Sequence, residues 1–326
     1  MIKVIVDIHG GDKSPKELLP GVIKALDNNL DLEVVVAGNE DIIKEYLNEE
    51  NYQDDRLTIL SCSQEVTNND SPTAILKEKK DSSLVKGMKE LSTSDASGIV
   101  SCGSTGAVLA SAMFILGRIN RCRPSLAATL PNVKGKLTIL LDCGANVDCK
   151  EEHLMGFATM GSVLSKATGV DNPRIGLLNV GVEEKKGNEL TKNVHNLMKE
   201  STLNFVGNIE ASSVLDGNVD VIVTDGFPGN VVLKNIEGVA KTLIGEMVMK
   251  MKTSNDPLEQ QVIGNLVGYF MSKYDFNSQG GGILLGVNKI VVKGHGAANA
   301  DTIYSTINMV YRLANNKMIE QMKELL

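Results

Sequence analysis

Short apolar runs alternate along the chain with longer stretches in which apolar residues recur every three or four positions. The short runs are rich in β-branched and aliphatic residues and suit strands that are covered on both faces. The longer stretches are typical of amphipathic helices. This alternation predicts an α/β fold with a largely parallel central sheet. The predicted strands cover residues 2–6, 32–37, 57–61, 98–101, 137–141, 174–180, 219–224 and 289–293, and the predicted helices cover residues 15–26, 40–47, 71–89, 107–116, 153–167, 187–199 and 297–314.

Residues 238–253 and 258–273 break the alternation, because they predict two consecutive helices that both carry an apolar stripe. Their short connection predicts an antiparallel helical hairpin that protrudes from the sheet. The same hairpin from a second copy would cover both stripes and form a symmetric homodimer through a four-helix bundle. The alternative is packing of the hairpin onto its own domain. No linker divides the chain, so we expect one domain over residues 1–326 with a hairpin insertion at about 238–273.

Composition and charge exclude some classes of function. Of the 326 residues, 42% are hydrophobic and 22% are charged, and the formal net charge is −7. A general nucleic-acid binder needs a basic surface, so that class is disfavoured. Five scattered cysteines argue against a disulfide framework and for a reducing compartment. The sequence shows no signal peptide and no apolar run of about 20 residues, which predicts a cytoplasmic protein.

Glycine-rich turns follow several of the predicted strands, among them GSTGA at 103–107 and GHGAA at 294–298. A small-residue turn that enters a helix offers unpaired N–H groups to an anion. We expect the turns to gather at one edge of the sheet, where open α/β folds bind ligands. A tight turn without a ligand is the alternative for each of them. The P-loop, the dinucleotide fingerprint and the serine-hydrolase elbow do not occur, so no nucleotide or hydrolase site is indicated.

Eight motifs follow one another in an order that resembles one family. They are D7…GGD at 7–12, SCGSTGA at 101–107, RP at 123–124, DCGANVDC at 142–149, FATMGS at 157–162, GNELTK at 187–192, DGFPGNV at 225–231 and HG at 295–296. In this order they closely resemble the bacterial phosphate acyltransferases of phospholipid synthesis, the PlsX family. The chain departs from the usual family residues at His9, Ser104, Pro228, Ala297 and Ala298.

The resemblance implies the conversion of acyl-[acyl carrier protein] and inorganic phosphate into acyl phosphate and free carrier protein. It also implies a three-layer α/β/α fold like that of isocitrate and isopropylmalate dehydrogenases, a homodimer, and no cofactor. Asp7, Asp142 and Asp225 end three predicted strands and are interpreted as fixing their own turns; a magnesium cluster is the alternative. No metal site is therefore expected.

Three residues are the candidates for catalysis. Lys186 would hold phosphate by charge, with Lys185 as the adjacent competitor or with a solvated loop lysine as the alternative. Asn230 would donate its amide to phosphate or to the oxyanion, unless it caps the following helix. His295 would donate to the carbonyl oxygen or protonate the leaving sulfur, unless it satisfies buried backbone. The candidates for phosphate or substrate binding are Gly10, Gly11, Asp12, Gly103, Ser104, Thr105, Gly106, Asn146, Asp225, Gly229 and Gly296.

Two surfaces are candidates for partners. Arg118, Arg121 and Arg123 form a local basic cluster that would dock the acidic acyl carrier protein, unless they are solvated charges at a helix end. The methionine-rich hairpin would support peripheral membrane contact, unless its apolar residues are core. The rival functions are a phosphotransacetylase that uses coenzyme A, a nicotinamide-dependent dehydrogenase, and a binding protein for phosphate or acyl chains.

Overall fold

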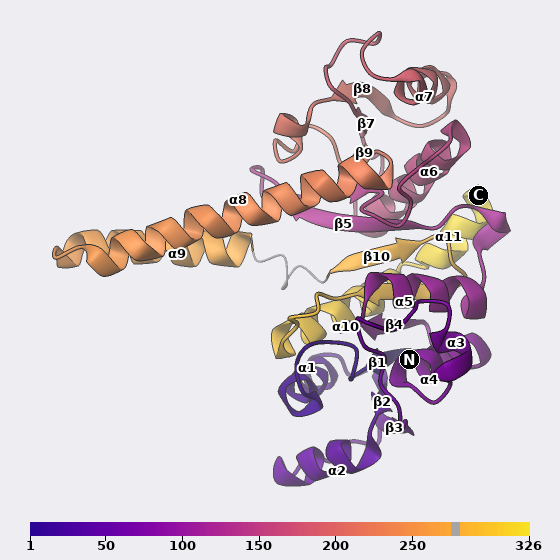
Figure 1. Cartoon of the computed structure of the whole chain (residues 1–326), viewed down its shortest axis with the longest axis vertical. Coiled ribbons are helices and arrows are strands. Elements are labelled where there is room, and N and C mark those ends of the chain that lie inside the picture. Colours follow the sequence, from indigo (N-terminus) through magenta and orange to yellow (C-terminus); the bar gives the residue numbers. More distant parts are fainter. Residues whose placement is uncertain (275–280) are drawn as a thin grey trace.

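A computed structural model describes residues 1–274 and 281–326. In these residues, 11 strands form one sheet with the order β3-β2-β1-β4-β11-β10-β5-β6-β9-β7-β8 (Figure 1). The strands are β1 (Ile2–Asp7), β2 (Leu32–Gly38), β3 (Leu57–Ser61), β4 (Gly98–Ser101), β5 (Ser125–Pro131), β6 (Leu137–Leu141), β7 (Ile175–Leu178), β8 (Phe205–Ile209), β9 (Val221–Val223), β10 (Gly282–Leu285) and β11 (Ile290–Lys293).

Helices cover both faces of this sheet, which confirms the predicted α/β class. α1, α6, α10 and α11 pack on one face, while α4, α5 and the start of α8 pack on the other. The α-helices are α1 (Pro15–Asn28), α2 (Glu40–Glu49), α3 (Ile75–Glu78), α4 (Ser83–Thr93), α5 (Thr105–Ser111), α6 (Glu151–Ala167), α7 (Glu189–Glu200), α8 (Gly226–Thr253), α9 (Pro257–Lys273), α10 (Ala300–Asn315) and α11 (Met318–Leu325).

The sheet is parallel on both sides of a central reversal. β10 runs antiparallel to β11 and to β5, and β5 runs antiparallel to β6. The strands β6, β9, β7 and β8 therefore run opposite to β1, β4 and β11. The expectation that all the glycine-rich turns share one edge is wrong, because these two antiparallel strands invert the sheet between its halves.

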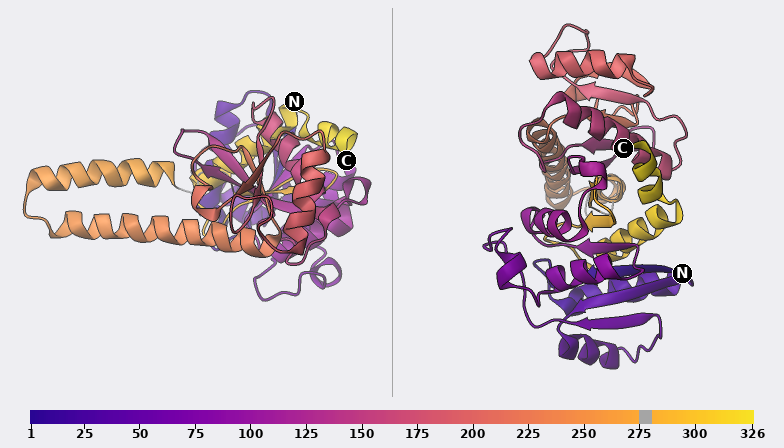
Figure 2. Two further views of the ribbon diagram at one scale, coloured as in Figure 1. Left: turned by 90° about the horizontal axis from the view of Figure 1, so that it is seen from above. Right: turned by 90° about the vertical axis from the view of Figure 1, so that its right-hand side faces the viewer.

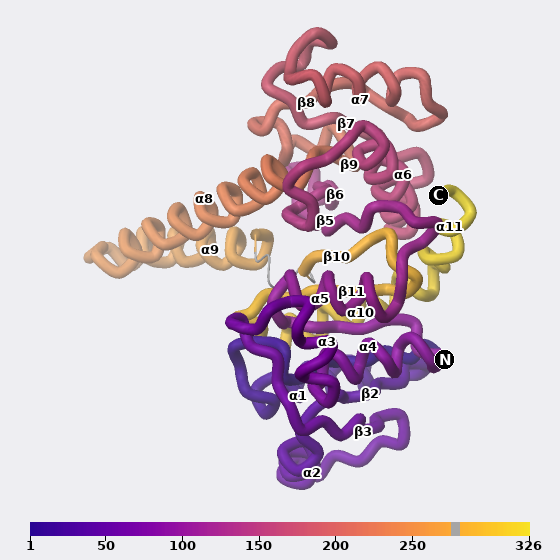
Figure 3. Tube along the Cα trace, turned by 45° about the vertical axis from the view of Figure 1, so that its right-hand side comes forward, coloured from indigo at the N-terminus to yellow at the C-terminus, as the bar shows by residue number. Residues whose placement is uncertain are grey.

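The core explains where the molecule is open. One continuous apolar cluster fills the face under α1, α10 and α6. On the opposite face the apolar residues form two clusters, one under α4 and α5 and the other under the start of α8. Figure 3 shows β10 lying between α5 and β5, and the strand order places β11 between β10 and β4. On this second face the two apolar clusters are separated above β10 and β5, the strands that reverse the direction of the sheet. The candidate site lies between the two clusters.

α8 and α9 form the predicted hairpin, which extends away from the body of the molecule (Figure 2). α8 begins at Gly226 and not near residue 238, because Asp225 caps it by accepting from the N–H of Phe227. Pro228 lies in the first turn, where a missing N–H costs no helical hydrogen bond. Several large apolar side chains of the hairpin are more than 40% exposed, namely Val239, Leu243, Met249, Leu258, Val262, Leu266, Tyr269 and Met271. Along residues 1–274 and 281–326, no helix is both long and apolar enough to cross a bilayer.

One further helix prediction was wrong. Residues 71–89 form two helices, α3 and α4, instead of one. The polar stretch between them turns at Ser82, whose hydroxyl accepts from the N–H of Val85 and caps α4. Ser71, at the start of the predicted helix, belongs to a turn instead, in which its carbonyl accepts from the N–H of Ala74.

Candidate active site

A small cavity lies between α5 and α8, above β5 and β10. Its volume is about 110 Å³, and we call it the cleft. Lys293 and His295 reach it from the end of β11, and Asn230 reaches it from α8. The structure therefore brings two of the three predicted catalytic residues together. They come from opposite halves of the sheet, since α8 begins beside the β6 loop and runs back toward β11.

A larger polar cavity of about 520 Å³ adjoins the cleft. The two cavities share Thr105 and Lys293 in their walls. The larger one lies among the loops that follow β1, β4 and β11. It is lined by most of the predicted phosphate-binding residues, which are Gly10, Gly11, Asp12, Gly103, Ser104, Thr105 and Gly296. Gly106 lies beside them and packs toward Pro72, where a Cβ would approach the Pro72 Cγ to 2.9 Å.

A buried carboxylate fixes these loops to one another. Asp7 accepts at 2.7 Å from the hydroxyl of Ser101, whose oxygen accepts in turn from the N–H of Gly103. Burial raises the pKa of the Asp7 carboxyl, although hydrogen bonds from Ser83 and Ser101 oppose that shift. A Cβ at Gly10 would lie only 2.6 Å from the Asp7 carboxylate, so the close approach of this loop requires glycine. Asp7 therefore holds the loops and is not exposed to a ligand.

Two of the family departures have a local explanation. His9 Nε2 accepts from the N–H of Asn39, while its Nδ1 lies 2.9 Å from the carboxylate of Glu65. Both ring nitrogens are thus engaged, and His9 joins the loops after β1 and β2. Ser104 caps α5 by accepting from the N–H of Ala107. These side chains shape the larger cavity from its walls.

His295 faces a carboxylate that the sequence did not reveal. Its Nε2 lies 3.5 Å from Glu237 Oε1, and the side chain of His295 is 35% exposed. Glu237 also pairs with Lys234 at 2.6 Å. Burial raises the pKa of the Glu237 carboxyl, but hydrogen bonds from His295 and Lys234 outweigh it and leave the pKa lowered. The carboxylate therefore stays charged beside the imidazole, as a partner that orients a histidine should.

Asn230 lies in the second turn of α8 and not at its start. Asp225 is the N-cap, so the alternative in which Asn230 caps the helix is excluded. Asn230 is exposed, and it packs near Gly144 of the β6 loop. Its amide faces the cleft on the same side of α8 as Lys234 and Glu237. This position suits the predicted donation to an anion.

The loop after β6 satisfies its own polar groups. Asp142 accepts from the N–H groups of Leu126, Ala145 and Asn146 and from the Asn146 side chain. Asn146 also donates to the carbonyl of Pro124 at 2.7 Å and accepts from the Arg123 Nε. Burial raises the pKa of the Asp142 carboxyl, against these hydrogen bonds. Asn146 was predicted to bind phosphate, but its amide is fully used in holding this loop.

The first turn of α8 supports the same loop. The N–H of Gly226 donates to the carbonyl of Asn146 at 2.7 Å. A Cβ at Gly229 would lie 1.9 Å from the Asp142 carbonyl oxygen, so the helix approaches the loop this closely only with glycine. Gly226 and Gly229 therefore hold the start of α8 against the β6 loop, and Asp225 caps the helix, whereas Asn230 faces into the cleft.

Lys186 lies apart from the cleft. It belongs to the exposed loop between β7 and α7, where its N–H donates to the carbonyl of Glu183. Its carbonyl accepts from the side chain of Asn179, and Lys185 is exposed beside it. A cavity of about 410 Å³ includes the following residues Gly187 and Asn188, together with Asp225, in its wall. In this chain Lys186 and His295 thus belong to different surfaces.

The predicted docking residues lie in the segment between α5 and β5. Arg118, Arg121 and Arg123 are all exposed. Arg121 has a positive φ of 61°, as does the neighbouring Asn120 at 43°, so this segment makes a tight turn. The hydrogen bond from Arg123 to Asn146 ties the turn to the β6 loop. The three arginines therefore lie on a segment that is held in place beside the β6 loop.

Sequence reasoning missed two residues of the cleft, Lys293 and Glu237. Lys293 is the last residue of β11 and directly precedes the GHG turn, so its place after a buried strand was a usable signal. Glu237 lies about two helical turns beyond Asn230. That spacing was hidden because the start of α8 was placed too late. Within residues 1–274 and 281–326, no three His, Cys, Asp or Glu side chains form a metal-binding group.

Comparison with known proteins gives the family. A sequence model described as "Fatty acid synthesis protein" matches residues 2–321. Proteins named "Phosphate acyltransferase" from Staphylococcus aureus strains MSSA476 and Newman are each 41% identical to this chain over 329 residues. Each match covers 99% of this chain and 98% of the relative.

Solved structures support the fold at lower identity. A phosphotransacetylase from Streptococcus pyogenes has a TM-score of 0.64 at 16% identity, over 98% of this chain and 94% of that one. A branched-chain phosphotransacylase from Enterococcus faecalis V583 has a TM-score of 0.58 at 16% identity, over 96% and 100%. A Salmonella typhimurium structure whose description names 4-hydroxythreonine-4-phosphate dehydrogenase has a TM-score of 0.52 at 12% identity, over 96% and 99%, which agrees with the expected dehydrogenase-like fold. From the family model and the full-length relatives, this chain belongs to the phosphate acyltransferase family of fatty acid synthesis proteins.

Proposed function

We propose that this protein transfers a fatty acyl group from acyl-[acyl carrier protein] to inorganic phosphate and so supplies acyl phosphate for phospholipid synthesis. Family membership supports acyl transfer to phosphate. The observation that carries the proposal is the cleft. There the ammonium of Lys293, the imidazole of His295 and the amide of Asn230 surround a volume of about 110 Å³. This volume accommodates orthophosphate, and the three groups match a phosphate ion and an adjacent carbonyl oxygen.

The proposed reaction forms one bond and breaks one. An oxygen of hydrogen phosphate attacks the thioester carbonyl carbon, and the carbon–sulfur bond then breaks. The hydroxyl proton of the phosphate passes to the sulfur, which leaves as the thiol of the carrier protein. A thiol is a good leaving group, so the main tasks of the protein are to position phosphate and to stabilise the oxyanion.

Two residues have roles that follow from their positions. His295, oriented by Glu237, donates to the carbonyl oxygen or delivers the proton to sulfur. Asn230 donates its amide to the phosphate or to the oxyanion across the cleft. Lys186 stays a prediction, since it would need to reach the anion from an exposed loop outside the cleft.

The testing experiment mixes acyl-carrier thioester with phosphate and follows acyl phosphate and free thiol together. Asn230→Ala and His295→Ala should each slow product formation about 10²- to 10³-fold, because a preorganised donor of this kind contributes that much to the rate. Lys186→Ala is assayed beside them, and Asn196→Ala on exposed α7 is the matched control. Full activity in all three test variants would remove the proposed site.

We also propose that the basic cluster of Arg118, Arg121 and Arg123 docks the acidic carrier protein. The cluster is exposed and adjoins the loop that supports the cleft. Because rim charges act mainly on encounter, charge reversal of Arg118 and Arg121 should raise the KM for the carrier thioester and leave kcat nearly unchanged. An unchanged KM would point to another surface.

The hairpin is proposed to form a homodimer and to touch the membrane. A groove of about 790 Å³ lies along it, with Val239, Leu243 and Leu266 in its wall. A second hairpin would bury these exposed residues, and a monomeric mass in light scattering would exclude that arrangement. The proposed location is the cytoplasm, with reversible contact to the inner face of the membrane through the hairpin. Liposome flotation without bound protein would reject the contact.

A phosphotransacetylase that uses coenzyme A is the second candidate function. It is favoured by the similarity of the fold to two transacylase structures, although at 16% identity this similarity concerns the fold alone. Parallel assays with acyl-coenzyme A and acyl-carrier thioester separate the two candidates. A higher kcat/KM for the coenzyme A thioester would favour the second.

A further inference from the structure

Lys293 occupies an unusual position among the lysines of this protein. It is the last residue of β11, and it lies in the wall of both the cleft and the larger polar cavity. It is only partly exposed. On the same side of β11, Val291 belongs to the apolar cluster under α4 and α5, so the stem of Lys293 continues an apolar surface. Its ammonium is thus delivered to the point where the two cavities meet.

This ammonium has no counter-ion in the described parts of the chain. No carboxylate forms an ion pair with it, whereas Lys234 across the cleft pairs with Glu237 at 2.6 Å. Lys289, the residue directly before β11, donates to the carbonyls of Ser94 and Ala96. Lys293 is therefore the lysine near the cleft that keeps its charge available, among residues 1–274 and 281–326.

The surroundings of Lys293 favour an anion at this point. Burial lowers the pKa of its ammonium, because a charged group loses solvation there. Asp12 and Glu237 act on it only at longer range, and Lys234 opposes its charge. The neighbouring thiol of Cys102 has its pKa raised by burial to about 12, so it is neutral and supplies no negative charge. A partly buried cation usually has a partner, and the open cleft leaves room for an anion to be that partner.

We propose that Lys293 is the residue whose ammonium holds orthophosphate in the cleft, between Thr105 of α5 and Asn230 of α8. This inference rests on the proposed function and assigns the phosphate-binding cation to β11 in place of the loop of Lys186. Phosphate held there touches Lys293 directly, so Lys293 is a catalytic residue of the proposed reaction. His295, two residues further along, then faces the carbonyl that the phosphate attacks.

Direct phosphate binding tests this assignment without requiring turnover. Inorganic phosphate is titrated into the full-length protein, and the rise of Tm with phosphate concentration gives the Kd. Lys293→Met keeps the apolar stem and removes the charge, so it should weaken phosphate binding about tenfold to a hundredfold. Lys293→Arg should retain most of the binding. Lys289→Met, which makes the same change in net charge at the other end of β11, is the matched control, and Lys186→Met is the competing variant.

Steady-state kinetics supply the second readout. In Lys293→Met the KM for phosphate should rise by the same factor, while the KM for the acyl-carrier thioester should stay constant. Unchanged phosphate affinity in Lys293→Met, or a loss confined to Lys186→Met, would overturn the inference. If the wild type binds phosphate through Lys293 but makes no acyl phosphate, the proposed reaction fails and the binding site stands. If Lys293→Met unfolds, Lys293→Arg and Lys293→Gln decide the matter, because equal affinity in both would exclude a role for the charge.

Discussion

Two groups of loops in this protein share one sequence signature and behave differently. The loops after β1 and β6 each begin with a buried aspartate and continue into glycine. Around Asp7 the loops of three strands leave a polar cavity with Lys293 unpaired at its mouth among the described residues. Around Asp142 the carboxylate is occupied by donors of its own loop and of β5.

The difference teaches how such a turn becomes either a binding site or a support. Aspartate and glycine fix the turn in both places, so they do not distinguish the two outcomes. What distinguishes them is whether donors remain free toward open space. The β6 loop has α8 packed against it at Gly229, whereas the loops after β1, β4 and β11 line a polar cavity of about 520 Å³.

The largest expected effect is a loss of stability in the β6 loop, where one carboxylate accepts four hydrogen bonds. Asp142→Ala removes the acceptor of four hydrogen bonds, two of them fully buried, so it should lower the free energy of unfolding by about 3–5 kcal/mol. Asp225→Ala removes one capping hydrogen bond and should cost only about 1 kcal/mol. Urea unfolding of both variants measures the difference. Equal losses would show that the β6 loop does not depend on its carboxylate.

Most helices and strands could be predicted from the sequence, but the reversal of the sheet could not. The predicted boundaries of β3, β4 and β6 agree with the structure, because each is an apolar run closed by polar residues or glycine. β5 reads Ser-Leu-Ala-Ala-Thr-Leu-Pro, with low strand propensity, and β10 is short and follows glycines. Both were missed, and with them the antiparallel strands that send the turns to opposite edges.

The site was predictable in its residue types and not in its grouping. Asn230 and His295 were found from the motifs, yet their meeting depends on α8 running back across the sheet. Glu237 is far from His295 in sequence, and no local pattern signals a contact between a helix and a distant loop. In the sequence Asn146 looks like a phosphate ligand. Only the folded structure shows that its amide already donates to Asp142 and to the carbonyl of Pro124.

A smaller effect should follow from the carboxylate that faces His295. Glu237→Gln keeps the size of the side chain and removes its charge, so His295 loses the group that orients it. We expect kcat to fall about tenfold, as for weakened support of a general acid, with little change in the KM for phosphate. Glu246→Gln, further along α8, is the control for net charge. A rise in the KM for phosphate with constant kcat would instead place Glu237 in phosphate binding.

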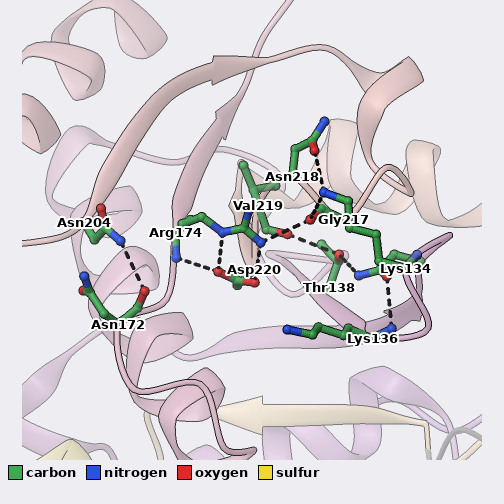
Figure 4. A network of polar contacts seen from close by, with 11 residues as sticks. Lys134, Lys136, Thr138, Asn172, Arg174, Asn204, Gly217, Asn218, Val219 and Asp220 are labelled. Atoms are coloured by element: carbon green, nitrogen blue, oxygen red, sulfur yellow. Dashed lines mark hydrogen bonds and ion pairs between the residues drawn. The ribbon is translucent and has the colours of Figure 1, made fainter.

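The smallest effect concerns the half of the sheet formed by β6, β9, β7 and β8, at the end opposite to the β6 loop. There Arg174 and Asp220 directly precede β7 and β9 (Figure 4). The guanidinium donates from Nε and Nη2 to both carboxylate oxygens at 2.9 Å, and the Arg174 N–H adds a third bond at 2.8 Å. The hydrogen bond from Arg174 is the main cause that lowers the pKa of Asp220 below its usual 3.8, against burial.

A carboxyl whose pKa is lowered by folding stabilises the protein at pH values above the pKa of the unfolded chain. That stabilisation is lost as the pH falls through the pKa of the folded protein. The Arg174 side chain is 39% exposed, so solvent weakens the ion pair. Asp220→Asn should therefore lower the free energy of unfolding by only about 1 kcal/mol near neutral pH. The gap between wild type and variant in urea unfolding should then shrink once the pH falls below 3.8. A gap that stays constant over this range would mean that packing and not charge holds this end, and that the two halves of the sheet differ only at their loops.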